Sequence, residues 1–318
     1  MLQLSVIIPC YNVEQYISRC LESLLKQDLS QDLYEIVIID DGSTDKTIEL
    51  ASGYAGTHAN IKIVSQENQG VGIARNTGLS VAQGKYIWFV DADDWIKLDS
   101  LKTLIDTAND QNADLIRFEY KRVWEYTGNT PLVKEVGKKI VFGKTRMLRK
   151  KVKRKFFLFC HLLKRDLIIQ HSISFPSIRM CEDVPFLAAY IRHAKKMVFV
   201  DIEIYFYFNR PGSLSNTFDL EHAMDILVAH EQMYNLLKTS ETNWALNHYL
   251  NRVVMIRVID VFRRSRSLSG EEKTYLVEYF KKSPLCKFPV IWLGISLRKI
   301  IAGYKIKYDP LKFLMSKE

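Results

Sequence analysis

Short apolar runs alternate with helical patterns through the first hundred residues of this 318-residue chain, and this alternation limits the fold more than any other feature. The apolar runs have the length of buried strands, and the stretches between them repeat apolar residues at helical spacing. The expected strands are Leu4–Pro9, Tyr34–Asp40, Ile61–Ser65 and Tyr86–Val90, and the expected helices are Glu14–Lys26, one that begins near Thr47, and Val71–Val81. This order predicts an α/β fold with a Rossmann-like, mostly parallel sheet.

Acidic turns follow two of these strands. Asp40 and Asp41 end the second strand, and Asp91, Asp93 and Asp94 follow the fourth. The carboxyl ends of parallel strands meet at one edge of the sheet, where open α/β sheets bind ligands. Like charges gathered there cost free energy unless a cation neutralises them, and oxygen ligands without His or Cys suit Mg²⁺ or Mn²⁺. The alternative is an acidic loop that caps the following helix.

The first strand is followed by Pro9-Cys10-Tyr11-Asn12 rather than by glycines. A dinucleotide-binding oxidoreductase needs GxGxxG at this position, because glycines let the backbone approach a pyrophosphate closely. Gly70 and Gly72 open the third expected helix, and their amides could meet a phosphate, but a lone GxG is more often a turn. The sequence therefore argues against a dinucleotide-binding oxidoreductase.

The five cysteines are odd in number, widely spaced and without a CxxC pair. They indicate neither a disulfide framework nor a zinc site, and a reducing cytoplasm fits this usage. The chain starts directly with a strand-like segment and lacks the basic start and cleavage site of a secretory signal. We therefore expect a cytoplasmic protein.

The net charge of +9 conceals an acidic first part and a basic second part. Residues 1–120 contain 9 Lys or Arg and 18 Asp or Glu, whereas residues 121–318 contain 36 and 18. Ten basic residues and no acidic one lie between Lys138 and Lys155. A solvated face, a surface for anionic lipid, a polyanionic substrate and nucleic acid are all open as explanations.

Four motifs occur in the order and at the spacing of one known family. They are SVIIPCYN at residues 5–12, IDDGSTD at 39–45, ENQGVGIARNTG at 67–78 and VDADD at 90–94. Over roughly residues 3–100 the chain resembles the family-two inverting glycosyltransferases with the GT-A fold, of the bacterial surface-polysaccharide type. The resemblance implies a transferase that uses a nucleotide-sugar donor.

The resemblance assigns donor-site roles to residues of these motifs. It places the nucleotide base against Pro9, Tyr11 and Asp41. Asp40 belongs to the same donor-binding turn. Arg75 is either a further nucleotide contact or a structural brace for one of the two aspartates of that turn.

The DxD motif of the family maps onto the turn after the fourth strand. It makes Asp93 the direct ligand of Mn²⁺ or Mg²⁺, with Asp91 as the second ligand and Asp94 nearby in the donor site. A divalent cation would act there as a Lewis acid on the departing diphosphate.

Displacement with inversion also needs a general base that takes the proton of the acceptor hydroxyl. The segment MCEDVPF at residues 180–186 resembles the family's Glu-Asp segment, which makes Asp183 the base and Glu182 a supporting residue. Asp183 followed by Val184 and Pro185 is also a good helix start, with Asp183 as N-cap. The two roles are compatible.

Two further segments carry weaker signals. Residues 205–215 resemble a tail motif of the family, in which Arg210 and Ser213 close over the diphosphate. The alternating aromatic residues of this segment also fit an edge strand. His161 lies in a buried-strand pattern and is interpreted as a structural histidine rather than a second base.

Residues 219–318 show helical patterns. The expected helices are Leu220–Leu237, Trp244–Arg264, Glu271–Lys282 and Pro289–Ala302. The apolar run in the last of them is much shorter than the ~20 residues that a membrane span needs. Its Trp292 and flanking basic residues fit an interfacial helix on anionic lipid, and packing against the catalytic domain or a second copy of the chain is the alternative.

The sequence thus predicts a catalytic domain at residues 1–218, with a nucleotide-binding half at 1–100 and an acceptor half at 101–218. A helical C-terminal region follows at 219–318. We expect transfer of a sugar from a UDP-linked donor to a glycan or polyprenyl-linked acceptor at the cytoplasmic membrane face, without a nucleic-acid partner. A metal-dependent nucleotidyltransferase and a basic protein that binds polyanions or nucleic acid are the alternatives.

Overall fold

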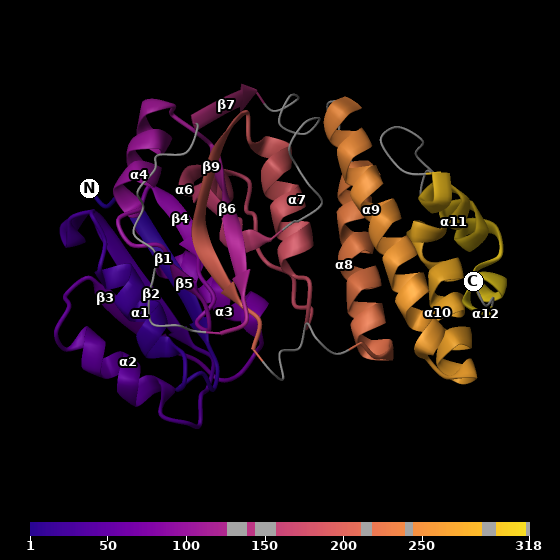
Figure 1. Ribbon diagram of the computed structural model, residues 1–318, viewed down its shortest axis with the longest axis horizontal. Helices are drawn as coiled ribbons and strands as arrows, with labels where there is room; N and C mark the ends of the chain where they lie inside the picture. Colours follow the sequence, from indigo (N-terminus) through magenta and orange to yellow (C-terminus); the bar gives the residue numbers. More distant parts are fainter. Residues whose placement is uncertain (126–138, 144–156, 211–217, 239–243, 288–296, 316–318) are drawn as a thin grey trace. The chain divides into compact units, whose positions relative to one another are not determined.

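The computed structural model describes residues 1–125, 139–143, 157–210, 218–238, 244–287 and 297–315 (Figure 1). These residues form two compact units. The first unit contains the described residues among 1–147, 157–177 and 193–210, and the second contains the others. A mixed sheet with helices makes up the first unit, and helices make up the second.

A nine-stranded sheet organises the first unit, in the order β3-β2-β1-β4-β8-β6-β9-β5 with β7 paired to β9. The strands are β1 Leu4–Cys10, β2 Tyr34–Asp40, β3 Ile61–Ser65, β4 Tyr86–Phe89, β5 Trp95–Ile96, β6 Leu115–Val123, β7 Lys139–Gly143, β8 His161–Lys164 and β9 Lys196–Phe208. The first four strands pair in parallel, as do β6 and β9. β5, β7 and β8 run antiparallel to their partners.

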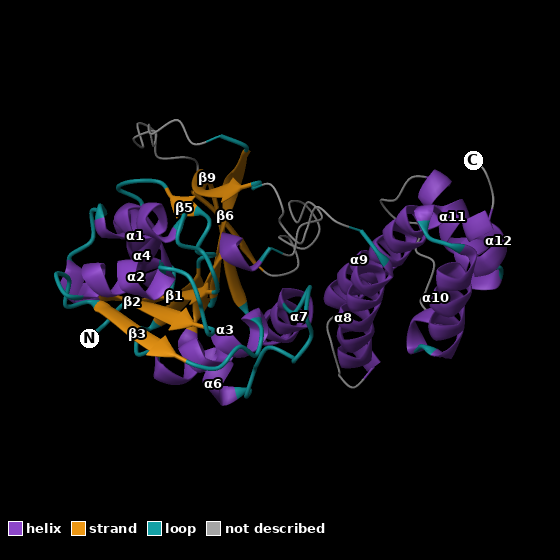
Figure 2. Cartoon of the chain, turned by 90° about the horizontal axis from the view of Figure 1, so that it is seen from below, coloured by secondary structure: helices purple, strands orange, loops and turns teal. Residues whose placement is uncertain are grey.

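Helices cover both faces of this sheet. They are α1 Ile17–Leu25, α2 Thr47–Ala55, α3 Val71–Val81, α4 Leu101–Asp110 and α6 Arg165–Gln170, and short 3-10 turns η1 Gln31–Leu33 and η2 Leu158–Cys160 precede β2 and β8. Figure 2 shows α1, α2 and α4 on one face of the parallel strands and α3 and α6 on the other. Successive side chains of a strand point to opposite faces, so a strand covered on both faces must be apolar throughout. β2 is buried along its whole length, and its buried polar residue Glu35 is bound by Ser5 and Lys62.

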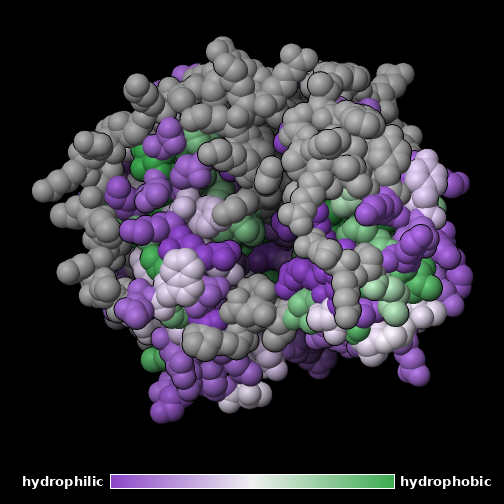
Figure 3. Space-filling model, turned by 45° about the vertical axis from the view of Figure 1, so that its right-hand side comes forward, coloured by the Kyte–Doolittle hydropathy of each residue, from purple (hydrophilic) through white to green (hydrophobic). Residues whose placement is uncertain are grey.

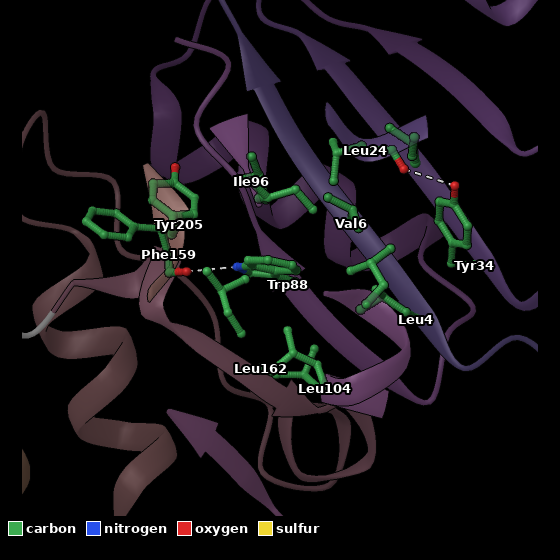
Figure 4. Close-up of a cluster of buried hydrophobic side chains, with 14 of the residues drawn as sticks. Leu4, Val6, Leu24, Tyr34, Trp88, Ile96, Leu104, Phe159, Leu162 and Tyr205 are labelled. Atoms are coloured by element: carbon green, nitrogen blue, oxygen red, sulfur yellow. Dashed lines mark hydrogen bonds between the residues drawn. The ribbon is translucent and has the colours of Figure 1, made fainter. Parts of the chain in front are cut away.

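The core on the α1 side surrounds Trp88 of β4 (Figure 4). The buried indole N–H donates to the carbonyl of Phe159 (2.8 Å), which gives this polar group the partner that burial requires. On the opposite face α3 lies close against the sheet. A Cβ on Gly78 would come within 2.4 Å of Ile7 Cγ2, so glycine allows this close approach.

The second unit is helical. Its helices are α7 Asp183–His193, α8 Leu220–Lys238, α9 Trp244–Arg264, α10 Gly270–Lys282, α11 Leu297–Tyr308 and α12 Pro310–Met315, with 3-10 turns η4 Ser265–Ser267 and η5 Pro284–Lys287. The last residue of α7, His193, is assigned to the first unit. A capping box begins α10: the side chain of Ser269 accepts from the N–H of Glu272, whose carboxylate accepts from the N–H of Ser269. Phe262 and Phe280 pack edge to face, 5.0 Å apart, between α9 and α10. None of the described helices combines the length and the apolar composition that a membrane span requires.

The structure confirms the predicted α/β fold and the helical C-terminal region. The first four strands lie within one residue of their expected bounds, and α3 has its expected bounds. α1 begins later than expected, because the N–H groups of Val13 and Glu14 donate to the side chains of Thr47 and Asp45 (2.8 and 3.1 Å) and tie this segment to a neighbouring turn. The five cysteines are free, as predicted.

Two sequence expectations are wrong. The edge-strand alternative fails at Tyr205 and Phe206, because this part of β9 pairs with β6 on one side and with β5 on the other. The last long helix does not end at Ala302, because α11 continues to Tyr308. Residues 288–296, which include Trp292 of the expected interfacial helix, lie outside the described residues.

Candidate active site

The two acidic turns lie on either side of β1, at the same edge of the sheet. β1 and β2 pair in register up to Cys10 and Asp40, and the N–H of Asp41 donates to the carbonyl of Cys10 (2.8 Å). On the other side of β1, the N–H of Val90 donates to the carbonyl of Ile7 (3.0 Å). Both turns therefore lie at one edge of the sheet, as the sequence predicts, and β1 lies between them.

Asp41 is buried and binds the loop that precedes α3. Its Oδ1 accepts from the side-chain amide of Gln66 (2.8 Å) and from the N–H of Gln69 (2.9 Å), and its Oδ2 accepts from the N–H of Gly70 (2.8 Å). Gly70 has a φ of +88°, a backbone conformation that favours glycine. The carboxylate therefore fixes this loop and the start of α3 through three charge-assisted hydrogen bonds.

Asp40 and Asn12 close the first acidic turn. The buried Asp40 accepts a hydrogen bond from the N–H of Ser43 at Oδ1 (2.9 Å). Asn12, with a φ of +51°, donates its N–H to Ser43 Oγ (3.1 Å) and accepts at its side-chain oxygen from the N–H of Thr44 (2.8 Å). Hydrogen bonds within the protein thus engage the side chains of this turn.

Tyr11 differs from the other residues that the resemblance assigns to the nucleotide base. Its side chain is 50% exposed, whereas Pro9 is partly buried and Asp41 is engaged by the loop before α3. An exposed aromatic ring beside a strand end is suited to stack on a base. Of the three, Tyr11 therefore offers the most accessible contact.

Asp91 is the first carboxylate of the second acidic turn, and Arg75 of α3 binds it. The Nη2 of Arg75 donates to Oδ1 of Asp91 (2.8 Å), and the Arg75 side chain is 7% exposed. The guanidinium also lies over the ring of Phe175 (5.6 Å to the centroid), and Phe175 exchanges two backbone hydrogen bonds with the side chain of Asn76 (2.8 and 2.9 Å). The sequence suggests Asp40 or Asp41 as the carboxylate that Arg75 braces, but the ion pair joins Arg75 to Asp91.

Asp93 is bound by two arginines in different ways. Arg210, just after β9, forms an ion pair from Nε to Oδ2 of Asp93 (2.8 Å), with side chains that are 32% and 23% exposed. Arg19 of α1 donates from Nη2 to the backbone carbonyl of Asp93 (2.5 Å). The Arg19 guanidinium lies over the rings of Trp95 (4.2 Å) and Phe208 (4.7 Å). One arginine thus holds the carboxylate of Asp93 and the other holds its main chain.

Asp94 is fully buried and bound by residues of β9. It accepts from the hydroxyl of Tyr205 at Oδ2 (2.5 Å) and from the N–H of Phe208 at Oδ1 (2.7 Å). The oxygen of Tyr205 also accepts from the N–H of Asp91 (3.1 Å). The hydroxyl of Tyr205 therefore connects the main chain at Asp91 with the carboxylate of Asp94.

Burial and mutual repulsion set the protonation of this turn. Burial, followed by the charge of Asp91, raises the pKa of Asp93. Burial, followed by the charges of Asp93 and Asp91, raises the pKa of Asp94 well above its ordinary value. Burial is the first cause of both increases, and the neighbouring carboxylates of the turn add to it. A cation beside Asp91 and Asp93 would favour the ionised form of these carboxyls.

The carboxylates of this turn suit a hard divalent cation that is bound partly by the protein and partly by a substrate. No three His, Cys, Asp or Glu side chains in the described part of the chain are arranged to hold a metal ion. Asp94 is unsuited, because Tyr205 and Phe208 occupy its oxygens. Asp91 and Asp93 remain, and Mg²⁺ is typically bound by one or two carboxylates together with phosphate oxygens.

The predicted base lies in the second unit. α7 begins at Asp183 itself, and Glu182 before it is buried. Cys181 has a φ of +63°, and its carbonyl accepts from the N–H of Val184 (3.1 Å), which forms a tight turn into the helix. Asp183 is thus the first helical residue rather than the N-cap. A carboxylate in the first turn is favoured by the helix dipole.

His161 and Ser213 complete the predicted set. His161 is buried, with Nδ1 2.8 Å from the carbonyl of Phe157. Burial, followed by the charge of Arg117, lowers the pKa of His161 to about 3, so the ring is neutral and structural, as the sequence predicts. Ser213 lies outside the described residues.

The sequence interpretation gives no role in the site to two residues that contact the second acidic turn. Tyr205 is included there only as one aromatic residue of a tail motif, and its hydroxyl contacts have no local signal. Arg19 is a polar residue of an amphipathic helix, which is ordinarily a solvated position. The structure alone brings both against the second acidic turn.

Residues 5–171 match the sequence profile of the family described as Glycosyl transferase family 2, which is more than half of the chain. The chain belongs to glycosyl transferase family 2. This membership confirms the resemblance carried by the four motifs. It favours the expected glycosyltransferase over the nucleotidyltransferase alternative.

Curated relatives of this family-2 chain include bacterial glycosyltransferases. The protein described as "Uncharacterized glycosyltransferase EpsJ" of Bacillus subtilis is 33% identical over 216 residues, which cover 66% of this chain and 62% of that protein. The poly(ribitol-phosphate) beta-glucosyltransferase of Bacillus spizizenii is 27% identical over 284 residues, 86% of this chain and 42% of that protein. The family-2 chain thus matches less than two thirds of the length of each of these two relatives.

Solved structures share the fold of this family-2 chain. S. aureus TarS 1-349 in complex with UDP-GlcNAc has a TM-score of 0.76 at 22% identity, over 98% of this chain and 87% of that chain. The mannosyltransferase PcManGT from Pyrobaculum calidifontis, in complex with GDP-Man and Mn²⁺, has a TM-score of 0.57 at 18% identity, over 99% and 88%. These similarities confirm the expected GT-A fold.

Proposed function

We propose that this glycosyltransferase moves a sugar from a nucleotide-diphosphate donor of the UDP class to a hydroxyl of a cell-surface polymer or its lipid-linked precursor. Residues 1–218 carry the catalysis in this proposal, and configuration at the sugar carbon is inverted. The observation that carries it is the second acidic turn, where Asp91 and Asp93 are paired with arginines at the carboxyl edge of the sheet. Such an edge is where open α/β sheets bind ligands.

The donor is proposed to lie between the two acidic turns. Tyr11 would stack on the nucleotide base, beside Pro9 and the turn at Asp40 and Asp41. Arg210 would bind the diphosphate together with Ser213. The structure of TarS in complex with UDP-GlcNAc supports a UDP donor, because TarS shares the fold of this chain.

A divalent cation, Mn²⁺ or Mg²⁺, is part of the proposal. Asp93 would hold it, with Asp91 as the second carboxylate. The cation supplies Lewis-acid stabilisation of the charge that develops on the departing diphosphate. The complex of PcManGT with GDP-Man and Mn²⁺ supports this assignment for the fold.

Asp183 is proposed as the general base. Its carboxylate would take the proton from the acceptor hydroxyl as that oxygen attacks the sugar carbon, and Glu182 would support it. Asp183→Asn should retain donor binding and lose transfer by a factor of about 10² or more, because general-base catalysis contributes about 10²–10⁴-fold. Asp166→Asn is the matched control, because Asp166 is an exposed carboxylate in the first turn of α6.

An anionic acceptor suits the charge distribution of the chain. Residues 121–318 contain 36 Lys or Arg against 18 Asp or Glu, and the Bacillus spizizenii relative is named for poly(ribitol-phosphate). A polymer with phosphate groups would be attracted to this basic part. Transfer to a neutral glycan that is as fast as transfer to a phosphate polymer at low salt would contradict this part of the proposal.

The end of the helical unit is proposed to rest on an anionic membrane at the cytoplasmic face. Tyr308, Leu311 and Met315 at the ends of α11 and α12 are 73%, 40% and 64% exposed, and Lys305 and Lys312 lie beside them in sequence. Hydrophilic residues cover most of the described surface in Figure 3, with apolar residues among them in small groups. Apolar and basic side chains together favour anionic lipid surfaces. Liposome flotation tests this, and a concentration-dependent dimer with no lipid binding would assign the face to a second copy of the chain.

A thermal-shift and calorimetric panel of UDP, GDP, dTDP and CDP sugars, each with and without Mn²⁺, tests the central proposal. A ligand that binds the folded chain raises its melting temperature. Metal-dependent stabilisation by UDP sugars is the expected result. A response confined to another nucleotide would correct the donor, and no response to any of them would contradict the proposed function.

A further inference from the structure

The second acidic turn already holds a cation at Asp93, and that cation is an arginine. Assuming the proposed function, we propose that Arg210 occupies the cation position at Asp93 until a diphosphate binds its guanidinium, so that the metal ion and the nucleotide enter the site as one unit. Arg210 would thus make metal binding conditional on the donor. Four features of the described residues support this role of Arg210.

The first feature is the difference in exposure between the two arginine–aspartate pairs. Both pairs have an N–O distance of 2.8 Å, but Arg75 is 7% exposed and Arg210 is 32% exposed. Arg75 also lies over the ring of Phe175. Arg75 is therefore fixed in its place at Asp91, whereas Arg210 can exchange the carboxylate of Asp93 for another anion.

The second feature is that the main chain at Asp93 does not depend on Arg210. Arg19 binds the backbone carbonyl of Asp93 (2.5 Å), and its guanidinium packs on Trp95 and Phe208. The side chain of Asp94 is bound by the N–H of Phe208. The main chain at Asp93 thus stays in position when Arg210 leaves the carboxylate.

The third feature is the support of Arg210 itself. Its N–H donates to the carbonyl of Phe208 (3.1 Å), which fixes the base of the side chain directly beside the acidic turn. Its guanidinium lies 5.4 Å from the ring centroid of Tyr16, and an aromatic face attracts a cation whether or not a carboxylate is bound. The guanidinium can therefore move away from Asp93 and remain at the site.

The fourth feature is the local charge. A divalent cation at Asp93 would lie next to the Arg210 guanidinium, and like charges at contact distance repel strongly in a partly buried site. A diphosphate changes this balance, because its oxygens accept bidentate hydrogen bonds from a guanidinium. Metal and diphosphate each remove an obstacle to the other, and such coupling acts equally in both directions.

The test measures Mn²⁺ binding by electron paramagnetic resonance, with and without UDP, in the wild-type chain, Arg210→Met and Arg210→Lys. We expect Arg210→Met to bind Mn²⁺ alone about tenfold more tightly than the wild type, within the range of about 5–150-fold that is usual for coupled sites. The same variant should bind UDP more weakly, and UDP should no longer strengthen its Mn²⁺ binding. Arg210→Lys keeps the charge and should bind Mn²⁺ alone as weakly as the wild type.

Arg122→Met is the matched control. Arg122 is an exposed arginine on β6 that lies over the ring of Tyr207 (5.2 Å), and its loss changes the net charge by the same amount. Its Mn²⁺ and UDP affinities should equal those of the wild type. Denaturation midpoints of all variants establish that they are folded.

The outcomes separate this inference from the proposed function. If Arg210→Met binds Mn²⁺ alone no better than the wild type, the inference is overturned, even where UDP and Mn²⁺ bind the wild type together. If the wild type binds neither UDP nor another nucleotide with Mn²⁺, the proposed function fails. A gain of Mn²⁺ affinity in both arginine-to-methionine variants would assign the effect to net charge and also overturn the inference.

Discussion

The two acidic turns at the edge of the sheet contain similar residues, but different kinds of groups bind their carboxylates. The turn at Asp40 and Asp41 is bound by backbone N–H groups and an amide, which are neutral donors. The turn at Asp91 to Asp94 is bound by guanidinium groups, a phenol hydroxyl and one N–H. The first turn is held by neutral groups of adjacent loops, and the second by groups of other elements that include two guanidinium groups.

This difference gives the two turns different roles, one in the fold and one in ligand binding. Hydrogen bonds from backbone N–H groups are lost only when the loop that carries them moves, so Asp41 is a permanent part of the fold. An ion pair between partly exposed side chains can exchange one cation for another without a change in the main chain. The second turn can therefore respond to a ligand, and the first turn supplies the rigid edge beside it.

The largest effect on metal-dependent donor binding should come from Asp93→Asn in the second turn. We expect the strengthening of nucleotide-sugar binding by Mn²⁺ to fall about 100-fold or more, because even residues that only orient metal ligands contribute about 10–100-fold. The free energy of unfolding without ligand should change by less than about 1 kcal/mol, because the ion pair with Arg210 is partly exposed. Calorimetry with and without Mn²⁺ and urea denaturation measure the two quantities.

Asp41→Asn makes the same chemical change in the other turn and should give the opposite result. The carboxamide cannot accept all three hydrogen bonds of the buried carboxylate, so the free energy of unfolding should fall by about 2–3 kcal/mol. The ratio of donor affinities with and without Mn²⁺ should stay as in the wild type. A collapse of that ratio would show that the two turns are functionally alike.

Tyr205→Phe probes the hydroxyl that connects Asp91 and Asp94. Its loss leaves the buried Asp94 with one fewer partner and the N–H of Asp91 without this acceptor. Mn²⁺-dependent donor affinity should fall about tenfold, as is usual for residues that orient metal ligands, and donor affinity without metal should be unchanged. Equal losses of donor affinity with and without Mn²⁺ would show that Tyr205 only stabilises the fold. Tyr34→Phe removes another buried hydroxyl hydrogen bond and is the control.

Ser43→Ala should have the smallest effect. The hydroxyl accepts one exposed hydrogen bond from the N–H of Asn12, so its removal should lower the free energy of unfolding by about 0.5–1 kcal/mol. Metal dependence should not change. A measurable effect on Mn²⁺-supported binding would extend the metal-responsive part of the edge to the first turn.

The positions of both turns follow from the sequence for a simple physical reason. Parallel strands that are buried on both faces are mostly apolar, so β1, β2 and β4 contain continuous apolar runs, and the acidic turns follow the runs of β2 and β4. β2 and β3 have their predicted bounds, and Asp40 and Asp91 stand where the sequence predicts the ends of their strands. The local sequence pattern thus predicts where the acidic turns of the site lie along the chain.

The partners of the carboxylates do not follow from the sequence. The N–H of Phe208 lies 114 residues after Asp94, and no local pattern indicates which strand will deliver it. The same applies to Arg75, for which the sequence suggests Asp40 or Asp41 as the partner, whereas the ion pair joins it to Asp91. Tertiary packing decides such pairs, so the sequence identifies the residues of the site but not its connections.

The distance in sequence between Asp94 and β9 has a consequence for synthesis. Ribosomes add about 5–20 residues per second, so a growing chain displays the parallel strands and their acidic turns on the order of ten seconds before β9 follows. During that interval Asp94 has neither Tyr205 nor Phe208, and Asp93 has no Arg210. A truncated product that ends before β9 would carry the DxD sequence without the contacts that shape it. The completed turn therefore forms only in a chain that has been translated past residue 210.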